Sequence, residues 1–260
     1  MPSTRFSLGS RGSHAPLFLE NPADKGIVVF IHGFMGSPRQ FDKFAETVQQ
    51  QGCSVAALLL PGHGGSAREF ASSSFERWQS HVDSEVERYS RDYASIWLVG
   101  HSMGGLLAIN AAVKHSASIR GLFLIACPFK VTTISTHAMK VRATQLFTLK
   151  RSPIKAAYIA GSSIELSPSL VWHLTRPTIE LKKLMQAASD NLPNVRAPVM
   201  AVYSASDELT SIKSLDILKS GLTNAEYDHL LLADSLHAYY PEHELAMIEQ
   251  ALLKLIAGSG

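Results

Sequence analysis

Apolar runs of strand length recur along the chain, and most of them are apolar at every position. The run Ile27–Ile31 (Ile-Val-Val-Phe-Ile) is β-branched or aromatic throughout. Continuous apolar runs of this kind are typical of strands that are buried on both faces of a parallel sheet. We predict further strands at 53–60, 96–99, 122–126, 199–203 and 227–232, and most of these runs are also apolar throughout.

Helical periodicity fills most of the intervals between these runs. From residue 75 to residue 93, apolar side chains recur every three or four positions with charged residues opposite them, which predicts an amphipathic helix. Similar patterns predict helices at 41–48, 103–115, 211–220 and 242–256. Strands that alternate with helices predict an α/β fold, in which helices cover both faces of a mainly parallel central sheet.

One long interval departs from this alternation. Residues 129–190 carry no strong strand pattern, and their helical patterns at 136–148 and 178–189 are separated by Ser-Pro pairs. Loops of this length without secondary structure are uncommon in compact domains. We therefore predict an α/β core formed by residues 1–128 and 191–260, and a small helical cap insertion, residues 129–190, that lies over the functional site.

Length and composition indicate a soluble globular enzyme. The chain has 260 residues, of which 46% are hydrophobic and 18% charged, and this is enough for one large core. No apolar run approaches the roughly 20 residues that would span a bilayer. The first residues lack the apolar stretch of a secretory signal, so a cytoplasmic location is expected. Cys53 and Cys127 lie in or beside apolar runs, which predicts buried free thiols.

Charge is unevenly distributed. The formal net charge is only +2, which disfavours nucleic acid as a partner. Residues 129–190, however, hold nine Lys or Arg against three Asp or Glu. Two interpretations stay open: the basic residues, among them Lys140, Arg142 and Lys150, form the solvated faces of cap helices, or they bind anionic ligands or an acidic membrane surface.

The segment Gly100-His101-Ser102-Met103-Gly104 has the pattern Gly-x-Ser-x-Gly. It directly follows one predicted strand and begins a predicted helix, which is the context of a nucleophile elbow in the α/β-hydrolase fold. In such a turn the serine hydroxyl is exposed at the carboxyl end of the strand. We therefore predict that Ser102 is a catalytic nucleophile, the alternative being a serine that only caps the helix.

A serine nucleophile requires a base, and the base requires an orienting acid. In this fold the acid and then the histidine follow the serine in the chain. Of the histidines at 229, 237 and 243, only His237 is predicted in the loop after the last strand. Asp207 follows the preceding strand and is the predicted acid, with Asp234 and Glu208 as alternatives.

Hydrolysis also requires donors for the oxyanion that develops on the substrate. We predict the backbone N–H groups of Phe34 and Met103 for this role, because one follows the first strong strand and the other follows the nucleophile. His32 and His63 lie in turns at strand ends and are predicted to be structural. His101 is expected to pack behind the nucleophile.

These segments together resemble a known family. His32-Gly33-Phe34, Pro61-Gly62-His63-Gly64, Gly100–Gly105, Asp207-Glu208 and His237 are similar, in order and spacing, to motifs of capped bacterial carboxylesterases related to monoacylglycerol lipases. The resemblance implies an α/β-hydrolase with a small cap, no cofactor and no metal, and carboxylic esters with short to medium acyl chains as substrates. In this family glycine commonly precedes the catalytic histidine, whereas Leu236 does so here.

The sequence therefore predicts a serine carboxylesterase that forms an acyl-enzyme intermediate, with monoacylglycerol lipase and lysophospholipase variants included. Thioesterases, carbon–carbon bond hydrolases and aminopeptidases are the alternatives on the same fold, and a non-catalytic binding protein is another. The basic charge of residues 129–190 disfavours an aminopeptidase, which must hold a substrate ammonium. Ser102 disfavours dehalogenases and epoxide hydrolases, which require aspartate at the elbow. The physiological ester and the oligomeric state are left open.

Overall fold

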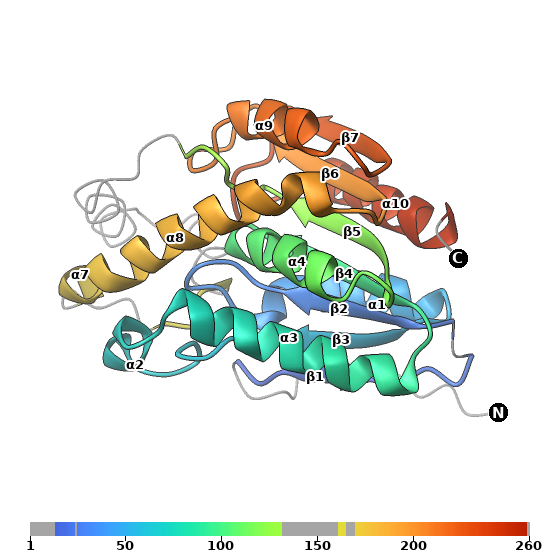
Figure 1. Cartoon of the computed structure of the whole chain (residues 1–260), viewed down its shortest axis with the longest axis horizontal. Helices are drawn as coiled ribbons and strands as arrows, with labels where there is room; N and C mark the ends of the chain where they lie inside the picture. Colours follow the sequence, from blue (N-terminus) through green and yellow to red (C-terminus); the bar gives the residue numbers. More distant parts are fainter. Residues whose placement is uncertain (1–13, 24, 132–160, 165–169, 259–260) are drawn as a thin grey trace.

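The computed structural model describes residues 14–23, 25–131, 161–164 and 170–258. Within them a seven-stranded sheet forms the centre of the molecule, in the order β1-β3-β2-β4-β5-β6-β7. β1 is antiparallel to β3, and every other neighbouring pair is parallel (Figure 1). The strands are β1 (Leu17–Leu19), β2 (Ile27–Ile31), β3 (Ser54–Leu58), β4 (Ile96–His101), β5 (Ile119–Ile125), β6 (Val199–Ser204) and β7 (Tyr227–Leu232).

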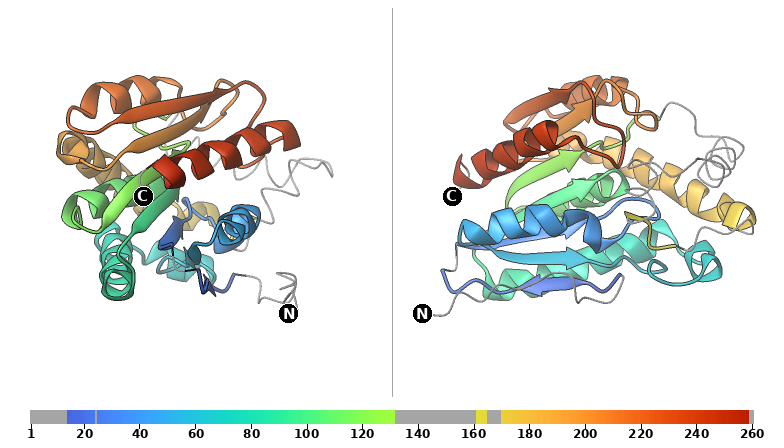
Figure 2. Two further views of the ribbon diagram at one scale, coloured as in Figure 1. Left: turned by 90° about the vertical axis from the view of Figure 1, so that its right-hand side faces the viewer. Right: turned by 180° about the vertical axis from the view of Figure 1, so that it is seen from behind.

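Helices cover both faces of this sheet (Figure 2). α1 (Asp42–Gln50) and α10 (Glu242–Gly258) lie on one face, while α3 (Phe75–Asp92), α4 (Met103–Lys114) and α8 (Thr175–Asn191) lie on the other. The remaining helices are α2 (Ala67–Ala71), α7 (Leu170–His173), α9 (Lys213–Gly221) and the short 3₁₀ segments η2 (Pro38–Phe41) and η3 (Leu192–Asn194).

The position of β2 between the two helical layers explains why its sequence is apolar at every position. Val28 and Phe30 belong to the core cluster that includes α1 and α10, whereas Ile27, Val29 and Ile31 belong to the cluster that includes α3 and α4. All five residues are completely buried. Each such side chain contributes about 1.5–3 kcal/mol by leaving water, so the alternation of faces stabilises both layers at once.

The predicted α/β fold with a mostly parallel sheet is confirmed, and most predicted elements agree with the observed ones to within a few residues. The short elements β1, α2, α7, η2 and η3 were not predicted. β1 has only three residues and pairs at the edge of the sheet, so it presents too short a pattern. α2 has only five residues, although its Ser66–Glu69 capping box is a start signal that the sequence does contain.

The predicted cap insertion lies largely outside the described residues, and so does its predicted helix at 136–148. The predicted helix at 178–189 is present as α8. Its side chains Leu184 and Ala188 share a core cluster with α4, so this part of the segment packs on the core. The division into core and cap stays a prediction. In the described part of the chain, no helix has both the length and the apolar character that crossing a bilayer requires.

Candidate active site

Three predicted site residues follow three parallel strands of the sheet. Ser102 comes directly after β4, Asp207 lies in the loop after β6, and His237 lies in the loop after β7. The carboxyl ends of parallel strands meet at one edge, and ligand sites of open α/β sheets form there. The structure therefore brings these residues together although Ser102 and His237 are 135 positions apart.

Ser102 occupies a strained turn between β4 and α4. Its φ of 52° and ψ of −121° place it in a region that residues other than glycine rarely adopt. The Ser102 N–H donates to the Ile125 carbonyl at 2.8 Å, which fixes the turn to β5. A Cβ on Gly100 would collide with the Gly105 backbone, and one on Gly104 with the Ile31 carbonyl. Both glycines of the motif are thus required by close backbone approach.

Ser102, His237 and Asp207 form a continuous chain of hydrogen bonds. Ser102 Oγ lies 3.0 Å from His237 Nε2, and His237 Nδ1 lies 2.9 Å from Asp207 Oδ2. Because a carboxylate only accepts hydrogen bonds, the proton of the neutral imidazole resides on Nδ1. Nε2 is then free to accept the Ser102 hydroxyl proton. Ser102 and His237 are each only 8% exposed, so the chain is shielded from water.

The environment of Asp207 keeps its carboxylate charged. Asp207 Oδ1 accepts hydrogen bonds from the N–H groups of Leu209 at 2.8 Å and Thr210 at 2.7 Å. Burial raises the pKa of Asp207, but the charge of His237 and the hydrogen bonds from His237, Thr210 and Leu209 outweigh it, so the pKa lies below its ordinary value. Asp207 is therefore ionised at neutral pH.

Two further side chains hold the backbone of His237. Its N–H donates to Glu208 Oε2 at 3.1 Å, and its carbonyl accepts a bond from His101 Nε2 at 2.8 Å. Burial, together with the charge of His237, lowers the pKa of His101 to about 3, so this ring is neutral. The carboxylate of Glu208, an alternative for the acid, accepts a hydrogen bond from the backbone of His237. Leu236, where the family commonly has glycine, donates its N–H to the Tyr239 carbonyl at 2.9 Å.

The other two candidate bases lie elsewhere. His229 is within β7, where its ring stacks on Tyr227. His243 is exposed on α10, with its Nε2 3.5 Å from a carboxylate oxygen of Asp234. Asp234, the remaining alternative for the acid, is thereby directed away from His237.

The predicted oxyanion donors lie on two turns beside Ser102. Met103 is the first residue of α4, so its N–H has no acceptor within the helix. Phe34 lies in the turn Gly33–Gly36, which is closed by a 2.8 Å bond from the Gly36 N–H to the Gly33 carbonyl. The φ of 59° at Met35 belongs to this turn. His32 supports it structurally, since its Nδ1 lies 3.0 Å from the Gly33 carbonyl and its Nε2 accepts the Leu60 N–H at 3.1 Å.

Sequence reasoning missed two residues that contact the site. The Thr210 hydroxyl lies 3.1 Å from the Ala126 carbonyl and 3.5 Å from His237 Nδ1. The Ser163 N–H donates to the Met35 carbonyl at 2.9 Å and so ties the segment 161–164 to the turn that carries Phe34. A threonine three residues after the acid and a serine in an irregular segment give no sequence pattern that would single them out.

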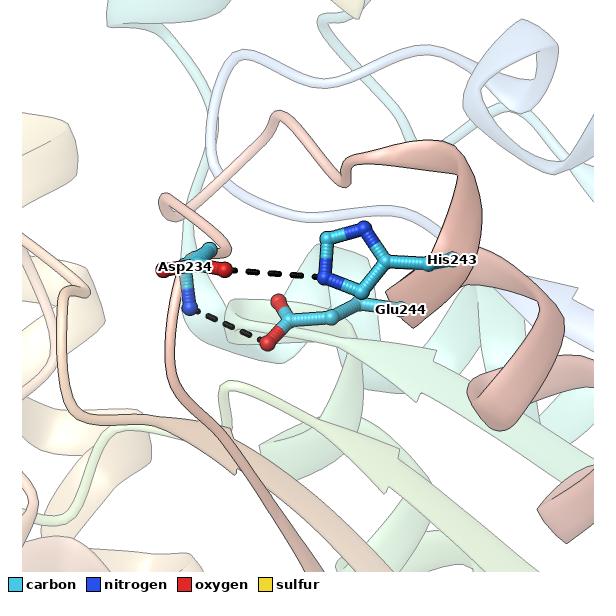
Figure 3. Close-up of side chains that lie close together, drawn as sticks. All are labelled: Asp234, His243 and Glu244. Atoms are coloured by element: carbon cyan, nitrogen blue, oxygen red, sulfur yellow. Dashed lines mark hydrogen bonds and ion pairs between the residues drawn. The ribbon is translucent and has the colours of Figure 1, made fainter.

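Asp234, His243 and Glu244 offer ligand atoms that lie within 4.8 Å of one another (Figure 3). A metal would have to compete for Glu244, because both of its oxygens already accept hydrogen bonds from the loop Ala233–Ser235. Asp234 and His243 are exposed and face each other in an ion pair. We assign no metal to this group.

The cysteines at 53 and 127 are free and buried, as predicted.

A cavity of about 220 Å³ adjoins the residues that flank the site. His101 and Ala238, the sequence neighbours of Ser102 and His237, are part of its wall. Arg39 and Gln40 add polar groups, while Phe44 and Ile125 add apolar ones. Its wall thus combines polar and apolar side chains.

Comparison with known proteins gives a consistent result. Residues 22–166 match the family model described as serine aminopeptidase, S33. The chain is 23% identical over 231 residues to the thermostable monoacylglycerol lipase of Bacillus sp. (strain H-257), covering 88% of this chain and 90% of that one. It is 25% identical over 209 residues to the monoglyceride lipase of Homo sapiens, covering 75% and 69%.

The solved structures agree with the fold. The crystal structure of the Paleococcus ferrophilus monoacylglycerol lipase superimposes with a TM-score of 0.73 at 20% identity, covering 94% of this chain and 99% of that one. A metagenome-derived lipolytic enzyme of the LipS and LipT study gives a TM-score of 0.72 at 21% identity, covering 94% and 97%. At these identities the likeness establishes the α/β-hydrolase fold.

Proposed function

Because the chain belongs to the serine aminopeptidase S33 family and is a hydrolase of the α/β-hydrolase class, we propose that it cleaves carboxylic esters through an acyl-enzyme formed on Ser102. The observation that carries the proposal is the hydrogen-bonded chain from Ser102 Oγ through His237 to Asp207. Its atoms are already placed for proton transfer. No cofactor takes part in the proposed reaction.

Acylation begins with attack of Ser102 Oγ on the ester carbonyl carbon. The hydroxyl proton moves to His237 Nε2, which lies 3.0 Å away, and the Asp207 carboxylate stabilises the imidazolium that forms. The N–H groups of Phe34 and Met103 donate to the oxyanion, and each such donor contributes about 10²–10³ in rate. When the tetrahedral intermediate collapses, Nε2 returns the proton to the departing alcohol.

Deacylation repeats these steps with water. His237 Nε2 takes a proton from the water as its oxygen attacks the acyl carbon, and the proton then passes to Ser102 Oγ as the acid leaves. The strained conformation of Ser102 holds Oγ toward His237 in both half-reactions, so no rearrangement of the turn is needed.

Two observations favour esters over peptides. The relatives that align over most of the chain are named as monoacylglycerol and monoglyceride lipases. An aminopeptidase must in addition hold a substrate ammonium, whereas residues 129–190 carry nine basic and three acidic side chains. We therefore propose esters with short to medium acyl chains, monoacylglycerols included. Hydrolysis of nitrophenyl esters from acetate to palmitate, beside monoacylglycerols of the same chain lengths, measures this preference.

Labelling with a fluorophosphonate probe tests the nucleophile. Purified wild-type protein should be modified at Ser102, and Ser102→Ala should lose both labelling and esterase activity. Ser220→Ala, which removes an exposed hydroxyl on α9, serves as the matched control and should behave as wild type. Wild-type protein that is folded but unlabelled would refute the proposal.

We also propose that the enzyme contacts anionic membranes through the exposed face of α7 and α8. Trp172 is 77% exposed and Ile179 is 49% exposed, and the exposed residues Arg176 and Lys182 lie beside them in sequence. Aromatic, aliphatic and basic side chains together are typical of interfacial helices. Figure 1 shows α7 and the start of α8 beyond the carboxyl edge of the sheet. Lys140, Arg142 and Lys150 lie outside the described residues.

Cosedimentation with vesicles tests this contact. Binding should occur with phosphatidylglycerol vesicles and not with phosphatidylcholine vesicles, and it should weaken with salt. The double variant Arg176→Glu, Lys182→Glu should bind at least about tenfold more weakly, since each basic residue near the surface contributes about 1 kcal/mol. Lys213→Glu, Lys219→Glu makes the same charge change on α9. Equal losses in both double variants would contradict a specific contact.

A further inference from the structure

Glu244 is a buried carboxylate whose two oxygens are both engaged by one short loop. It lies in the first turn of α10 and is 4% exposed. Its Oε1 accepts the N–H groups of Ala233 at 2.7 Å and Asp234 at 3.0 Å, and its Oε2 accepts the Ser235 hydroxyl at 2.5 Å. Figure 3 shows the bond from the Asp234 backbone to the Glu244 carboxylate. The mechanism described above does not use this carboxylate.

The loop that Glu244 holds is the connection between β7 and His237. β7 ends at Leu232, and only Leu236 separates Ser235 from His237. Each residue of an extended chain spans at most about 3.3–3.6 Å. Because only one residue intervenes, a displacement of Ser235 also displaces the imidazole of His237. Glu244 therefore fixes the position of the loop segment that leads from β7 to His237.

The opposite side of the same loop is bound by the strand and loop that carry Asp207. The Ser204 hydroxyl donates to the Ser235 carbonyl, and the Ser206 hydroxyl donates to the Ala233 carbonyl, both at 2.6 Å. The loop is thus held on one side by α10 and on the other by the residues that precede Asp207. This arrangement sets the distance between His237 Nδ1 and Asp207 Oδ2.

A role limited to attaching α10 to the sheet does not explain these contacts. Ile248, Leu252 and Leu255 already bury α10 against the core that includes β5 and β6. A buried carboxylate is costly unless donors compensate its charge, and here all three donors belong to the three residues that follow β7. Burial is the largest single effect on the pKa of Glu244 and raises it. The hydrogen bonds from Ser235, Asp234 and Ala233 together outweigh burial, so the pKa lies below its usual value.

We propose that Glu244 is a positioning residue that places His237 between Ser102 and Asp207 by fixing the loop Ala233–Ser235. This inference rests on the proposed function of His237 as the general base. Displacements of about 1 Å in a reacting group can reduce rates by about 10²-fold, so loss of the carboxylate should act on the chemical step. Substrate binding should change little, because Glu244 bonds to the loop that precedes His237 and would act through the position of that residue.

The test compares Glu244→Ala and Glu244→Gln with wild-type enzyme, at a temperature well below the lowest Tm of the three. Glu244→Ala should lower kcat for a nitrophenyl ester by about 10–100-fold with KM within threefold. Glu244→Gln keeps an amide oxygen for Ala233 and Asp234 and should recover most of kcat. Glu242→Ala removes an exposed carboxylate in the same helical turn and should leave kcat unchanged.

The rate of fluorophosphonate labelling separates the possible outcomes. A Glu244→Ala protein with a lower Tm but wild-type kcat and labelling rate would overturn the inference, because Glu244 would then only stabilise the fold. Unlabelled wild-type protein would instead refute the proposed function. If Glu244→Ala does not fold, Ser235→Ala removes only the hydroxyl donor to Oε2 and should lower kcat by about three- to tenfold. An unchanged kcat in Ser235→Ala would then overturn the inference.

Discussion

Asp207→Asn is a substitution whose consequence can be worked out from the hydrogen bonds of the site. Asp207 Oδ1 accepts two N–H donors, from Leu209 at 2.8 Å and Thr210 at 2.7 Å. In asparagine only the oxygen can occupy that position, so the amide nitrogen replaces Oδ2 beside His237 Nδ1. An amide N–H donates and does not accept, so the imidazole proton is shifted to Nε2, where it prevents transfer from Ser102.

The expected loss is therefore catalytic rather than structural. In serine enzymes of this arrangement the wrong imidazole tautomer reduces kcat by about 10⁴-fold, which corresponds to about 5.4 kcal/mol of transition-state stabilisation. The charged hydrogen bond that is lost contributes about 1.5–3 kcal/mol to stability, but the neutral amide is less costly to bury. The Tm should consequently change little.

Hydrolysis of a nitrophenyl ester at pH 7 to 8 measures the effect, with circular dichroism as the check on folding. Glu208→Gln is the matched control, because the Glu208 carboxylate accepts the His237 backbone N–H at 3.1 Å, and glutamine retains an acceptor there. It should reduce kcat by less than about tenfold. An Asp207→Asn enzyme within tenfold of wild type, or a Glu208→Gln enzyme impaired as severely as Asp207→Asn, would refute the assignment of the acid.

Three further outcomes are expected. Burial lowers the pKa of His63 to about 4 and that of His101 to about 3, whereas both are about 6.5 in the unfolded chain. The unfolded state therefore binds more protons than the folded state below pH 6.5. Urea unfolding should show that the free energy of unfolding at pH 5 is lower than at pH 7 by about 2 kcal/mol per histidine. If the free energy of unfolding were the same at pH 5 and pH 7, these rings would not be buried as neutral bases. Gly104→Ala should destabilise by about 1–3 kcal/mol through its collision with the Ile31 carbonyl. Gly161→Ala, whose added Cβ has no atom of the described residues within 4 Å, should leave the Tm unchanged. Dialysis against a chelator should leave esterase activity intact, and its loss would indicate a metal.

Sequence was sufficient for the central strands because they are buried on both faces. β2 begins and ends at the predicted residues, since a continuous apolar run has sharp ends. Ser102 was predictable for a related reason. A side chain at position 100 or 104 would collide with the neighbouring backbone, so the turn requires glycine at both positions and the motif is visible in the sequence. His237 and Asp207 followed from chain order in the fold rather than from any local pattern.

The supporting contacts of the site could not be predicted in this way. Glu244 and Thr210 interact with residues of other elements, and the sequence contains no periodicity that would relate them to His237. Glu208 differs again: its position after β6 indicates a carboxylate near the site, but the sequence does not indicate that it accepts the His237 backbone N–H. Such contacts depend on how loops fold over the sheet edge, which long-range packing decides.

Backbone strain in the described residues is concentrated at the carboxyl edge of the sheet. Met35, Ser102 and Ala126 are the non-glycine residues with positive φ there, and each follows one of the neighbouring strands β2, β4 and β5. Strain of this kind costs about 1–3 kcal/mol per residue and persists only where the surroundings impose it. β4 and β5 lie inside the sheet and are almost wholly buried, so these strands supply that constraint. These buried strands thus hold Ser102 in the conformation that the proposed attack requires.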